Sequence, residues 1–266
     1  MLSFASICPH PPIIIPTIGK SSDLKKAAST IKAMEELTKN FKKTKPETVI
    51  VISPHGSTLF DYFCANVSPT LCGNFYNFGD FKTELSFKNN LEFISILGKE
   101  CENKKIPLTG VKVKELDHGA LVPLYYLSQK LENLKVVPLS FSYLDIKTHF
   151  KFGKILGKIC QKSKEKIAIV ASGDLSHRLT PDAPAGFSSK GKEFDEKLVE
   201  LLKKKDIDGI LNLDSAFVEE AGECGYRSVI ILSGVLSNFD WQSEILSYEG
   251  PFGVGYLVAN FKIKTE

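Results

Sequence analysis

Histidine is the residue type through which this sequence is best equipped to do chemistry. Four of its five histidines, His10, His55, His118 and His177, stand in short segments marked by proline or glycine. The segments read CPHPP around His10, SPHG around His55, DHG around His118 and GDLSH up to His177. Imidazole binds zinc, iron, copper and nickel, and its pKa near neutrality suits proton transfer. The pattern therefore predicts a metal site or a proton-transfer site.

The segments before three of these histidines predict how the four are brought together. Apolar runs over residues 2–8, 48–52 and 166–171 are typical of buried strands, and each ends shortly before a histidine. Loops that follow the strands of a parallel sheet meet at its carboxyl edge, where such folds bind ligands. We therefore expect the four histidines to share one cleft. The fifth, His149, lies in a predicted helix near lysines, and we expect it on the solvated surface.

An anionic third ligand, added to two histidines, would hold a divalent ion and leave open positions for a substrate. The acidic candidates lie toward the C-terminal end of the chain: Glu219, Glu220, Glu223 and Glu249. Cys224 offers a thiolate as a further alternative. Glu223 is the best placed, because a junction between a loop and a predicted helix can face the cleft.

The remaining apolar patterns predict strands that alternate with helices. Further strands are expected over residues 61–67, 135–141, 242–248 and 254–261. Helices are expected over residues 23–41, 91–103, 121–131, 147–163, 194–202 and 227–236. Ser22 is the expected N-cap of the first helix, and the Gly- and Asn-rich stretch after residue 67 is expected to be a surface loop. The alternation predicts a single α/β domain over residues 1–266, with a largely parallel central sheet and helices on both faces.

Composition bounds the function further. The chain has 266 residues, of which 43% are hydrophobic, and its net charge of +3 is spread along its length. This charge gives no argument for nucleic-acid binding and at most a weak preference for an anionic substrate. The apolar runs are too short to span a membrane, and the N-terminus lacks the basic stretch of a signal peptide. Six separated cysteines without a C-x-x-C pair indicate reduced thiols, so we expect a cytoplasmic protein.

Other catalytic motifs are not matched. The GPFGVG segment at residues 250–255 departs from the dinucleotide-binding order, and a tight turn between two strands explains it better. The sequence contains no P-loop, no H-E-x-x-H and no G-x-S-x-G. Ser172 or Ser176 beside His177 makes a weak case for a serine nucleophile, because the pairing is local and nothing elsewhere in the sequence supports it.

Taken together, several segments resemble the class III extradiol ring-cleavage dioxygenases of the LigB type, including the Memo-like proteins. They are PHPP at residues 9–12, SPHG at 53–56, DHGALVPL at 117–124, SGDLSH at 172–177, GECGYRS at 222–228 and SYEGPFGVGY at 247–256. The likeness spans nearly the whole chain, in the same order. It is closest to the LigB-like domain of the AmmeMemoRadiSam group.

The resemblance implies a role for each of the histidines. In the dioxygenases, two histidines and a glutamate hold a non-haem Fe(II), and His10 and His55 match the two histidine positions. His177 matches the acid/base histidine, and His118 matches a histidine that contacts the substrate or oxygen. Asp174 matches a position shared with the Memo-like proteins. The catalytic residues implied are therefore His177, His118 and Asp174.

The third ligand departs from the family pattern. The family glutamate opens the helix that here starts near Tyr226, and strict register places Gly225 at that point. Glu223 serves only with a shift of two residues, and Memo-like relatives take their third ligand from elsewhere. The metal ligands implied are His10, His55 and Glu223, with Fe(II) as the expected ion and Zn(II) as the alternative.

Three functions follow from this resemblance. The first is an Fe(II)-dependent oxidoreductase, like the extradiol dioxygenases, that takes O2 and a catechol-like or other small chelating substrate. The second is a Zn(II) or Fe(II) enzyme of hydrolytic or modification-pathway type. The third is a Memo-like, non-catalytic module that binds a peptide or a partner protein. AMMECR-type and radical SAM proteins are the partners implied, and a homo-oligomer is the assembly implied.

Overall fold

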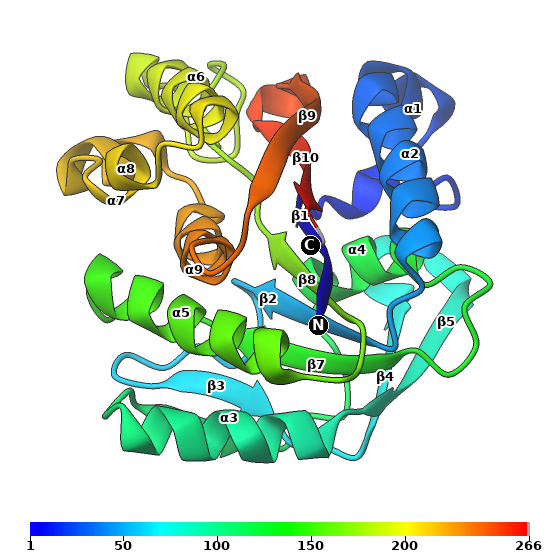
Figure 1. The fold of residues 1–266 in the computed structure, drawn as a ribbon. Coiled ribbons are helices and arrows are strands. Elements are labelled where there is room, and N and C mark those ends of the chain that lie inside the picture. Colours follow the sequence, from blue (N-terminus) through cyan, green and yellow to red (C-terminus); the bar gives the residue numbers. More distant parts are fainter. Residues whose placement is uncertain (265–266) are drawn as a thin grey trace.

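Ten strands form one mixed sheet within residues 1–264, the part of the chain that the computed structural model describes (Figure 1). The order along the main path is β4-β5-β7-β2-β8-β1-β10-β9, and β3 joins both β7 and β6 beside it. The central strands β5, β7, β2, β8 and β1 run parallel, and antiparallel pairs extend the sheet at both ends. The bounds are β1 Leu2–Cys8, β2 Thr48–Ser53, β3 Phe63–Asn66, β4 Thr70–Phe75, β5 Asp80–Asn89, β6 Leu108–Val111, β7 Lys135–Ser140, β8 Ile167–Ser172, β9 Trp241–Glu249 and β10 Tyr256–Ile263.

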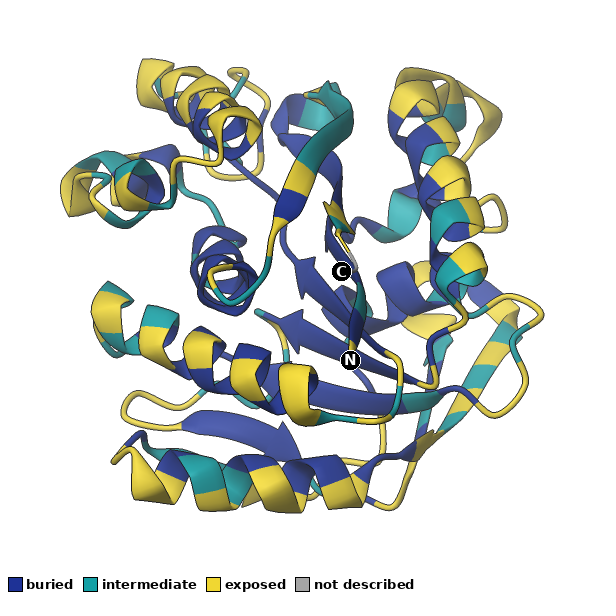
Figure 2. Cartoon of the chain, viewed as in Figure 1, coloured by how far each residue is buried: buried dark blue, intermediate teal, exposed yellow. Residues whose placement is uncertain are grey.

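Helices cover both faces of this sheet. The first face carries α2 Ala28–Thr44, preceded by α1 Ser21–Lys26, together with α4 His118–Leu127. The second face carries α3 Leu91–Asn103, α5 Ile146–Lys162, α6 Ser189–Lys204, α7 Ile207–Leu211, α8 Ser215–Ala221 and α9 Tyr226–Leu236. Figure 2 shows the central strands buried and the outer faces of α2, α3 and α5 exposed. The predicted α/β fold with a largely parallel sheet between two helical layers is confirmed.

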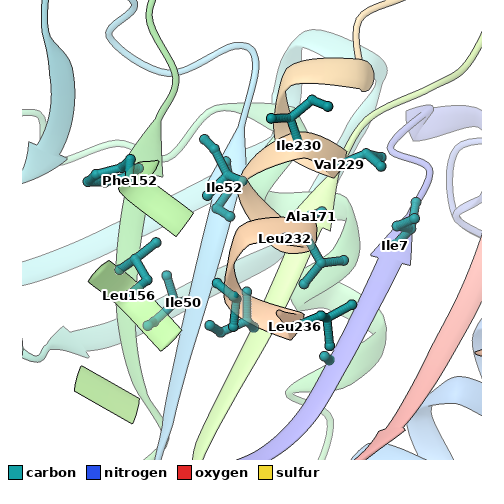
Figure 3. Close-up of a cluster of buried hydrophobic side chains, with 14 of the residues drawn as sticks. Ile7, Ile50, Ile52, Phe152, Leu156, Ala171, Val229, Ile230, Leu232 and Leu236 are labelled. Carbon is teal, nitrogen blue, oxygen red and sulfur yellow. The ribbon is translucent and has the colours of Figure 1, made fainter. Parts of the chain in front are cut away.

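Strand β2 shows why these apolar runs become central strands. Val49 and Val51 point into the core beneath α2 and α4, whereas Ile50 and Ile52 point into the core beneath α5 and α9 (Figure 3). All four are fully buried, so a run with no polar alternation fits a strand covered on both faces. Burial of each such side chain stabilises the fold by about 1.5–3 kcal/mol.

Helix α9 is buried from Ser228 to Leu236, because it packs between the sheet and α5. Glycines let the backbones of the two helices approach closely. A Cβ atom at Gly153 of α5 would lie 2.0 Å from the carbonyl oxygen of Ile231 and 2.9 Å from the Cα of Gly234. This crossing fixes α9 against the sheet, and with it the segment that enters α9. Among the described residues 1–264, no helix is both long and apolar enough to cross a membrane.

The N-terminal helical region differs from the expectation of one helix over residues 23–41. It forms the short α1 and the longer α2, which meet at Ala27. Ser22 is not the N-cap, because α1 already begins at Ser21 and Lys20 occupies the cap position. The Asp23 carboxylate accepts a hydrogen bond from the backbone N–H of Lys20 at 3.2 Å, which favours this earlier start.

The Gly- and Asn-rich stretch after residue 67 is not the expected surface loop. It forms the antiparallel hairpin β4–β5, with a turn at Tyr76–Phe78 and Gly79 in the left-handed region at φ 87°. The glycines and asparagines that are typical of a loop lie in β4, TLCGNF, and in the turn, whereas β5, DFKTELSFKN, alternates exposed with partly covered positions. Strand β6 and the short helices α7 and α8 were also not predicted.

His149 is not on the surface, contrary to expectation. It is fully buried on α5, with Nε2 3.0 Å from the carbonyl oxygen of Ser142. Its ring packs edge-on against Phe63, with ring centroids 4.9 Å apart. The neighbouring lysines Lys147 and Lys151 are exposed on other faces of the same helix. Proximity to lysines in the sequence was therefore a poor guide to the face of the helix.

Candidate metal centre

The carboxyl edge of the parallel strands gathers the histidine-bearing segments. His10 follows β1, His55 follows β2, and Asp174 and His177 follow β8, which lies between those two strands. His118 is the first residue of α4. The rings of His10 and His55 have centroids 4.8 Å apart, and His55 stacks on His118 at 4.3 Å. His10, His55 and His118 thus form one cluster.

Three potential ligand atoms converge within this cluster. The Nε2 atoms of His10 and His55 are 3.0 Å apart, and the Sγ atom of Cys224 is 3.6 Å from Nε2 of His10. All three atoms lie within 4.8 Å of one another. Ligands bound tetrahedrally to one zinc-like ion, with bonds of about 2.0–2.3 Å, stand roughly 3.3–3.7 Å apart. The first two separations lie within a few tenths of an ångström of that spacing, and the third, between His55 Nε2 and Cys224 Sγ, is at most 4.8 Å.

The hydrogen bonds of His10 fix the nitrogen that is left for a metal. The hydroxyl of Ser172 donates to the carbonyl oxygen of Gly119 at 2.5 Å, so its oxygen is free to accept. Nδ1 of His10 lies 2.9 Å from that oxygen and therefore carries the proton that it donates. The lone pair of Nε2 then points toward His55 and Cys224. Two nitrogens and a sulfur that face one another in this way can serve together as ligands of one cation.

Asp174 forms hydrogen bonds with both His10 and Cys224. Its Oδ1 accepts the backbone N–H of His10 at 3.0 Å, and its own N–H donates to the Cys224 sulfur at 3.3 Å. The backbone N–H of Cys224 in turn donates to the Asp174 carbonyl oxygen at 3.3 Å. Burial raises the pKa of the Asp174 carboxyl to about 7, and the hydrogen bond from His10 opposes that rise. Asp174 thus holds His10 and Cys224 by hydrogen bonds, and its second carboxyl oxygen lies 3.9 Å from Nε2 of His10.

His177 and His118 flank the ligand group. Nδ1 of His177 lies 2.9 Å from the carbonyl oxygen of Gly222 and donates to it, which leaves Nε2 without a proton. Burial lowers the pKa of His177, of His118 and, more strongly, of His10. Repulsion from the charges that His55, His118 and His177 would carry adds to the effect at His10. Crowded, partly buried imidazoles are thereby kept neutral, the state in which they bind metals.

The acidic candidates for the third ligand lie outside the group formed by His10, His55 and Cys224. Oε2 of Glu223 accepts the backbone N–H of Tyr226 and so caps the start of α9, while burial raises the pKa of Glu223 to about 7. Oε1 of Glu249 accepts hydrogen bonds from the N–H and hydroxyl of Thr30 at 2.7 and 2.6 Å. Glu219 and Glu220 lie in α8. Among residues 1–264, the ligand group that includes His10 and His55 is completed by Cys224, and Glu223 lies outside it.

Two positioning residues were missed in the sequence. Ser172 holds His10, and the hydroxyl of Ser53 donates to Oδ1 of Asp117 at 2.5 Å. The same oxygen of Asp117 caps α4 by accepting the N–H of Ala120 at 3.1 Å. A recurrent pattern could have revealed both serines, because β2 and β8 each end in serine directly before a functional loop.

A pocket of about 480 Å³ opens beside His55 and His118. It lies between the end of β3, β6, β7 and the turn that follows β4, and Phe78 of that turn forms part of its wall. The rings of Phe78 and His118 have centroids 5.7 Å apart. A small aromatic ligand could therefore lie against the histidine cluster and extend into this pocket.

Comparison with known proteins finds one family over nearly the whole chain. The family model described as the catalytic LigB subunit of aromatic ring-opening dioxygenase matches residues 4–259. A Clostridium acetobutylicum protein is 35% identical over 94% of this chain, which spans only 55% of that protein's length. The 3,4-dihydroxyphenylacetate 2,3-dioxygenase of Escherichia coli is 25% identical and is covered over 87% of its length, against 86% of this chain.

Two more distant likenesses were found, one to a sequence and one to a solved structure. A MEMO1 family protein of Methanocaldococcus jannaschii is 24% identical over 80% of this chain and 68% of its own length. The crystal structure of an uncharacterized protein from Escherichia coli K12 superposes with a TM-score of 0.65 at 18% identity, covering 97% of this chain and 99% of that one. The latter shows the fold alone. With the family model matched over nearly its whole length, the chain belongs to the LigB family, whose members include both extradiol dioxygenases and MEMO1 family proteins.

Proposed function

We propose that this protein is a metal-dependent oxidoreductase that binds one Fe(II) ion and acts with O2 on a catechol-like or other small chelating substrate. The observation that carries the proposal is the convergence of the His10 and His55 Nε2 atoms and the Cys224 sulfur beside the pocket. Three protein ligands leave positions open for a substrate. A bound ferrous ion would supply Lewis-acid and redox chemistry toward the substrate and O2.

The chain's own residues would position the reactants and move protons. His177 presents Nε2 as a base, because its Nδ1 proton is held by the Gly222 carbonyl. His118 presents its ring between His55 and Phe78, where it can contact the substrate. Asp174 holds the backbone of His10 and orients Cys224. These are the roles that the likeness to the extradiol dioxygenases suggests for the same three residues.

A zinc enzyme is the second candidate, and one observation favours it. The third atom of the ligand group is a sulfur, where the extradiol pattern has a carboxylate. Thiolate ligands select zinc and copper(I) more strongly than carboxylates do. Two histidines and one cysteine would hold Zn(II) with an open position for water, and the reaction would then be hydrolytic.

Metal content tests the proposal. Protein purified without oxygen and without a tag should contain about one iron per chain, and the His10→Ala/His55→Ala variant should contain none. O2 consumption with a panel of catechols would then follow in the loaded protein. One zinc per chain, with activity that needs no oxygen, would replace the oxidoreductase by the hydrolytic enzyme. Absence of any metal under all loading conditions would favour a Memo-like binding module.

The third ligand is tested by a pair of variants. Cys224→Ser should lose the metal, and Cys72→Ser is its matched control, because Cys72 lies outside the ligand group. Glu223→Gln should keep the metal, since an amide oxygen can still accept the Tyr226 N–H. Loss of metal in Glu223→Gln but not in Cys224→Ser would restore the glutamate as the ligand.

The cellular compartment and the partner proteins are also proposed here. All six cysteines are free thiols, which supports a reducing compartment such as the cytoplasm. The likeness to the AmmeMemoRadiSam group suggests AMMECR-type and radical SAM proteins as partners. Co-purification of the protein from its own cells would test both partners.

A further inference from the structure

The pocket beside His55 and His118 has a distinct electrostatic character. Two carboxylates, those of Glu115 and Asp117, line it, together with the amides of three asparagines: Asn66, Asn74 and Asn77. Among the described residues 1–264, no lysine or arginine lines it. This lining is opposite in sign to the chain's net charge of +3, which by itself weakly favours an anionic ligand.

The charged groups of this wall are hydrogen-bond acceptors, and their carboxylate oxygens are only partly occupied. Oε1 of Glu115 takes a single amide hydrogen bond, from Asn74 at 3.3 Å, and the residue is exposed. Oδ1 of Asp117 is occupied by Ser53 and by the start of α4. Its Oδ2 faces Gly56, another residue of the pocket wall, because a Cβ atom there would lie 3.4 Å from that oxygen. The amide of Asn66 is bound to the backbone of Val113 at 2.5 Å.

Phe78 adds to the preference for positive charge. Its side chain is 40% exposed, and it stands in the pocket wall beside His118, with the two rings edge to face. The face of an aromatic ring attracts a cation and gives nothing to a carboxylate. An anionic tail would lose part of its hydration shell on entering the pocket, and within residues 1–264 no positively charged side chain there would compensate for that loss.

We propose that the substrate of this site carries a cationic ammonium tail on its chelating ring, and that Glu115 and the neighbouring acidic wall select it over substrates with a carboxylate tail. This inference rests on the proposed function, because it assumes that the ring end chelates the metal at His10 and His55. The tail would extend past His55 and His118 into the pocket, where carboxylates and the Phe78 ring receive it.

Three probes with the same ring and different tails test the inference. Dopamine carries an ammonium, 4-ethylcatechol a neutral tail, and 3,4-dihydroxyphenylacetate a carboxylate. Their dissociation constants would be measured by calorimetry on the metal-loaded protein without oxygen, so that no turnover occurs. We expect dopamine to bind roughly tenfold more tightly than 3,4-dihydroxyphenylacetate, with 4-ethylcatechol between them, because the acidic wall attracts the ammonium tail and repels the carboxylate tail. Added salt should narrow the difference.

Variants at Glu115 assign the preference to the pocket wall. Glu115→Gln should reduce the ratio of the two affinities, and Glu115→Lys should reverse it, while 4-ethylcatechol binds as before. Glu102→Gln, a neutralisation at an exposed site on α3, is the matched control and should leave all three affinities unchanged.

The outcomes separate this inference from the proposed function. If all three catechols bind equally, or if the carboxylate probe binds best, the charge preference is overturned while the catechol-binding site stands. If a preference for dopamine survives unchanged in Glu115→Lys, the assignment to this wall is overturned. If no catechol binds to protein that holds its metal, the proposed function fails and the inference fails with it.

Discussion

Gly173 and Gly225 pass so close to each other that a Cβ atom on Gly173 would lie 2.1 Å from the Cα of Gly225. Gly173 directly follows β8, and Gly225 directly precedes α9. Their contact draws the start of α9 onto the carboxyl edge of the sheet. Cys224, the neighbour of Gly225, is thereby brought within 3.6 Å of Nε2 of His10.

Substitution of Gly173 should therefore weaken metal binding at the proposed site without unfolding the protein. Gly173→Ala places a methyl group where the backbone of Gly225 now lies, so the start of α9 must move away and carry Cys224 with it. We expect metal affinity to fall by at least about tenfold, as when groups around a metal site are disturbed. Metal titration monitored by competition with a chelator would measure the loss, and circular dichroism would check the fold.

Gly98→Ala is the matched control for this substitution. Gly98 lies in α3, and nothing stands within 4 Å of a Cβ atom added to it. It should bind metal normally and gain roughly 0.5–1 kcal/mol in stability, since alanine favours a helix more than glycine does. Normal metal binding in Gly173→Ala would mean that the position of Cys224 does not depend on this contact.

A second prediction concerns the residue that orients His10. Ser172→Ala removes the acceptor of the Nδ1 proton, so that the ring can rotate or take the other tautomer. Loss of such a supporting hydrogen bond typically weakens metal binding about 10–100-fold. The Kd for the metal should rise by that factor, and the metal-free protein should lose about 1–3 kcal/mol of stability, because the Gly119 carbonyl and the Nδ1 proton of His10 lose their buried partner. An unchanged Kd would show that packing alone holds the ring of His10.

The central strands could be predicted because the sequence of each is a run of apolar residues, which indicates a buried strand. Strands β1, β2, β7 and β8 are apolar runs without alternation, as burial on both faces demands, and the loops after β1, β2 and β8 hold His10, His55 and His177. Parallel strands then place these residues at one edge. The edge hairpin β4–β5 was missed because Gly73 and Asn74 in β4, with Asn77 and Gly79 in the turn, are residue types typical of loops.

The ligand group itself could not be predicted from spacing. Cys224 and His10 are 214 positions apart, and their contact depends on how α9 packs on β8. Glu223 and Cys224 are adjacent in the sequence, and both residue types can bind a metal ion as its third ligand. The structure separates them by direction, because Glu223 turns to the N-terminus of α9 while Cys224 turns to His10. The spacing of apolar residues does not define the start of a helix to within one residue, so it could not show which of the two side chains faces His10.

A third prediction concerns the crossing of α5 and α9. Gly153→Ala inserts a methyl group 2.0 Å from the carbonyl oxygen of Ile231. This oxygen belongs to the backbone of helix α9, so the clash can be relieved only if the two helices move apart. We expect a loss of roughly 1–3 kcal/mol or more in the free energy of unfolding. Urea denaturation would measure it, beside the stabilising Gly98→Ala. Equal stability of the two variants would show that the helices separate without cost.

A fourth prediction concerns Asp195, a fully buried acid on α6. Its oxygens accept hydrogen bonds from the N–H of Ser176 at 2.8 Å and the hydroxyl of Tyr248 at 2.7 Å, so it braces the loop that carries His177. Burial raises the pKa of Asp195 to about 7, although both hydrogen bonds oppose the rise. The native protein therefore retains a proton in a pH range where the unfolded chain has already released it.

The sign of the pH dependence follows from this difference. Between about pH 4 and pH 7 the native state binds more protons at Asp195 than the unfolded state, so this contribution to stability declines as the pH rises, by at most about 1.4 kcal/mol per pH unit. Asp195→Asn keeps the shape and removes the titration. The free energy of unfolding in urea, measured from pH 4.5 to 7.5, should fall more steeply in the wild type than in Asp195→Asn. Other buried acids, such as Asp174 and Glu223, are present in both proteins and cancel in the difference. Parallel curves would mean that Asp195 is ionised throughout, held so by Ser176 and Tyr248.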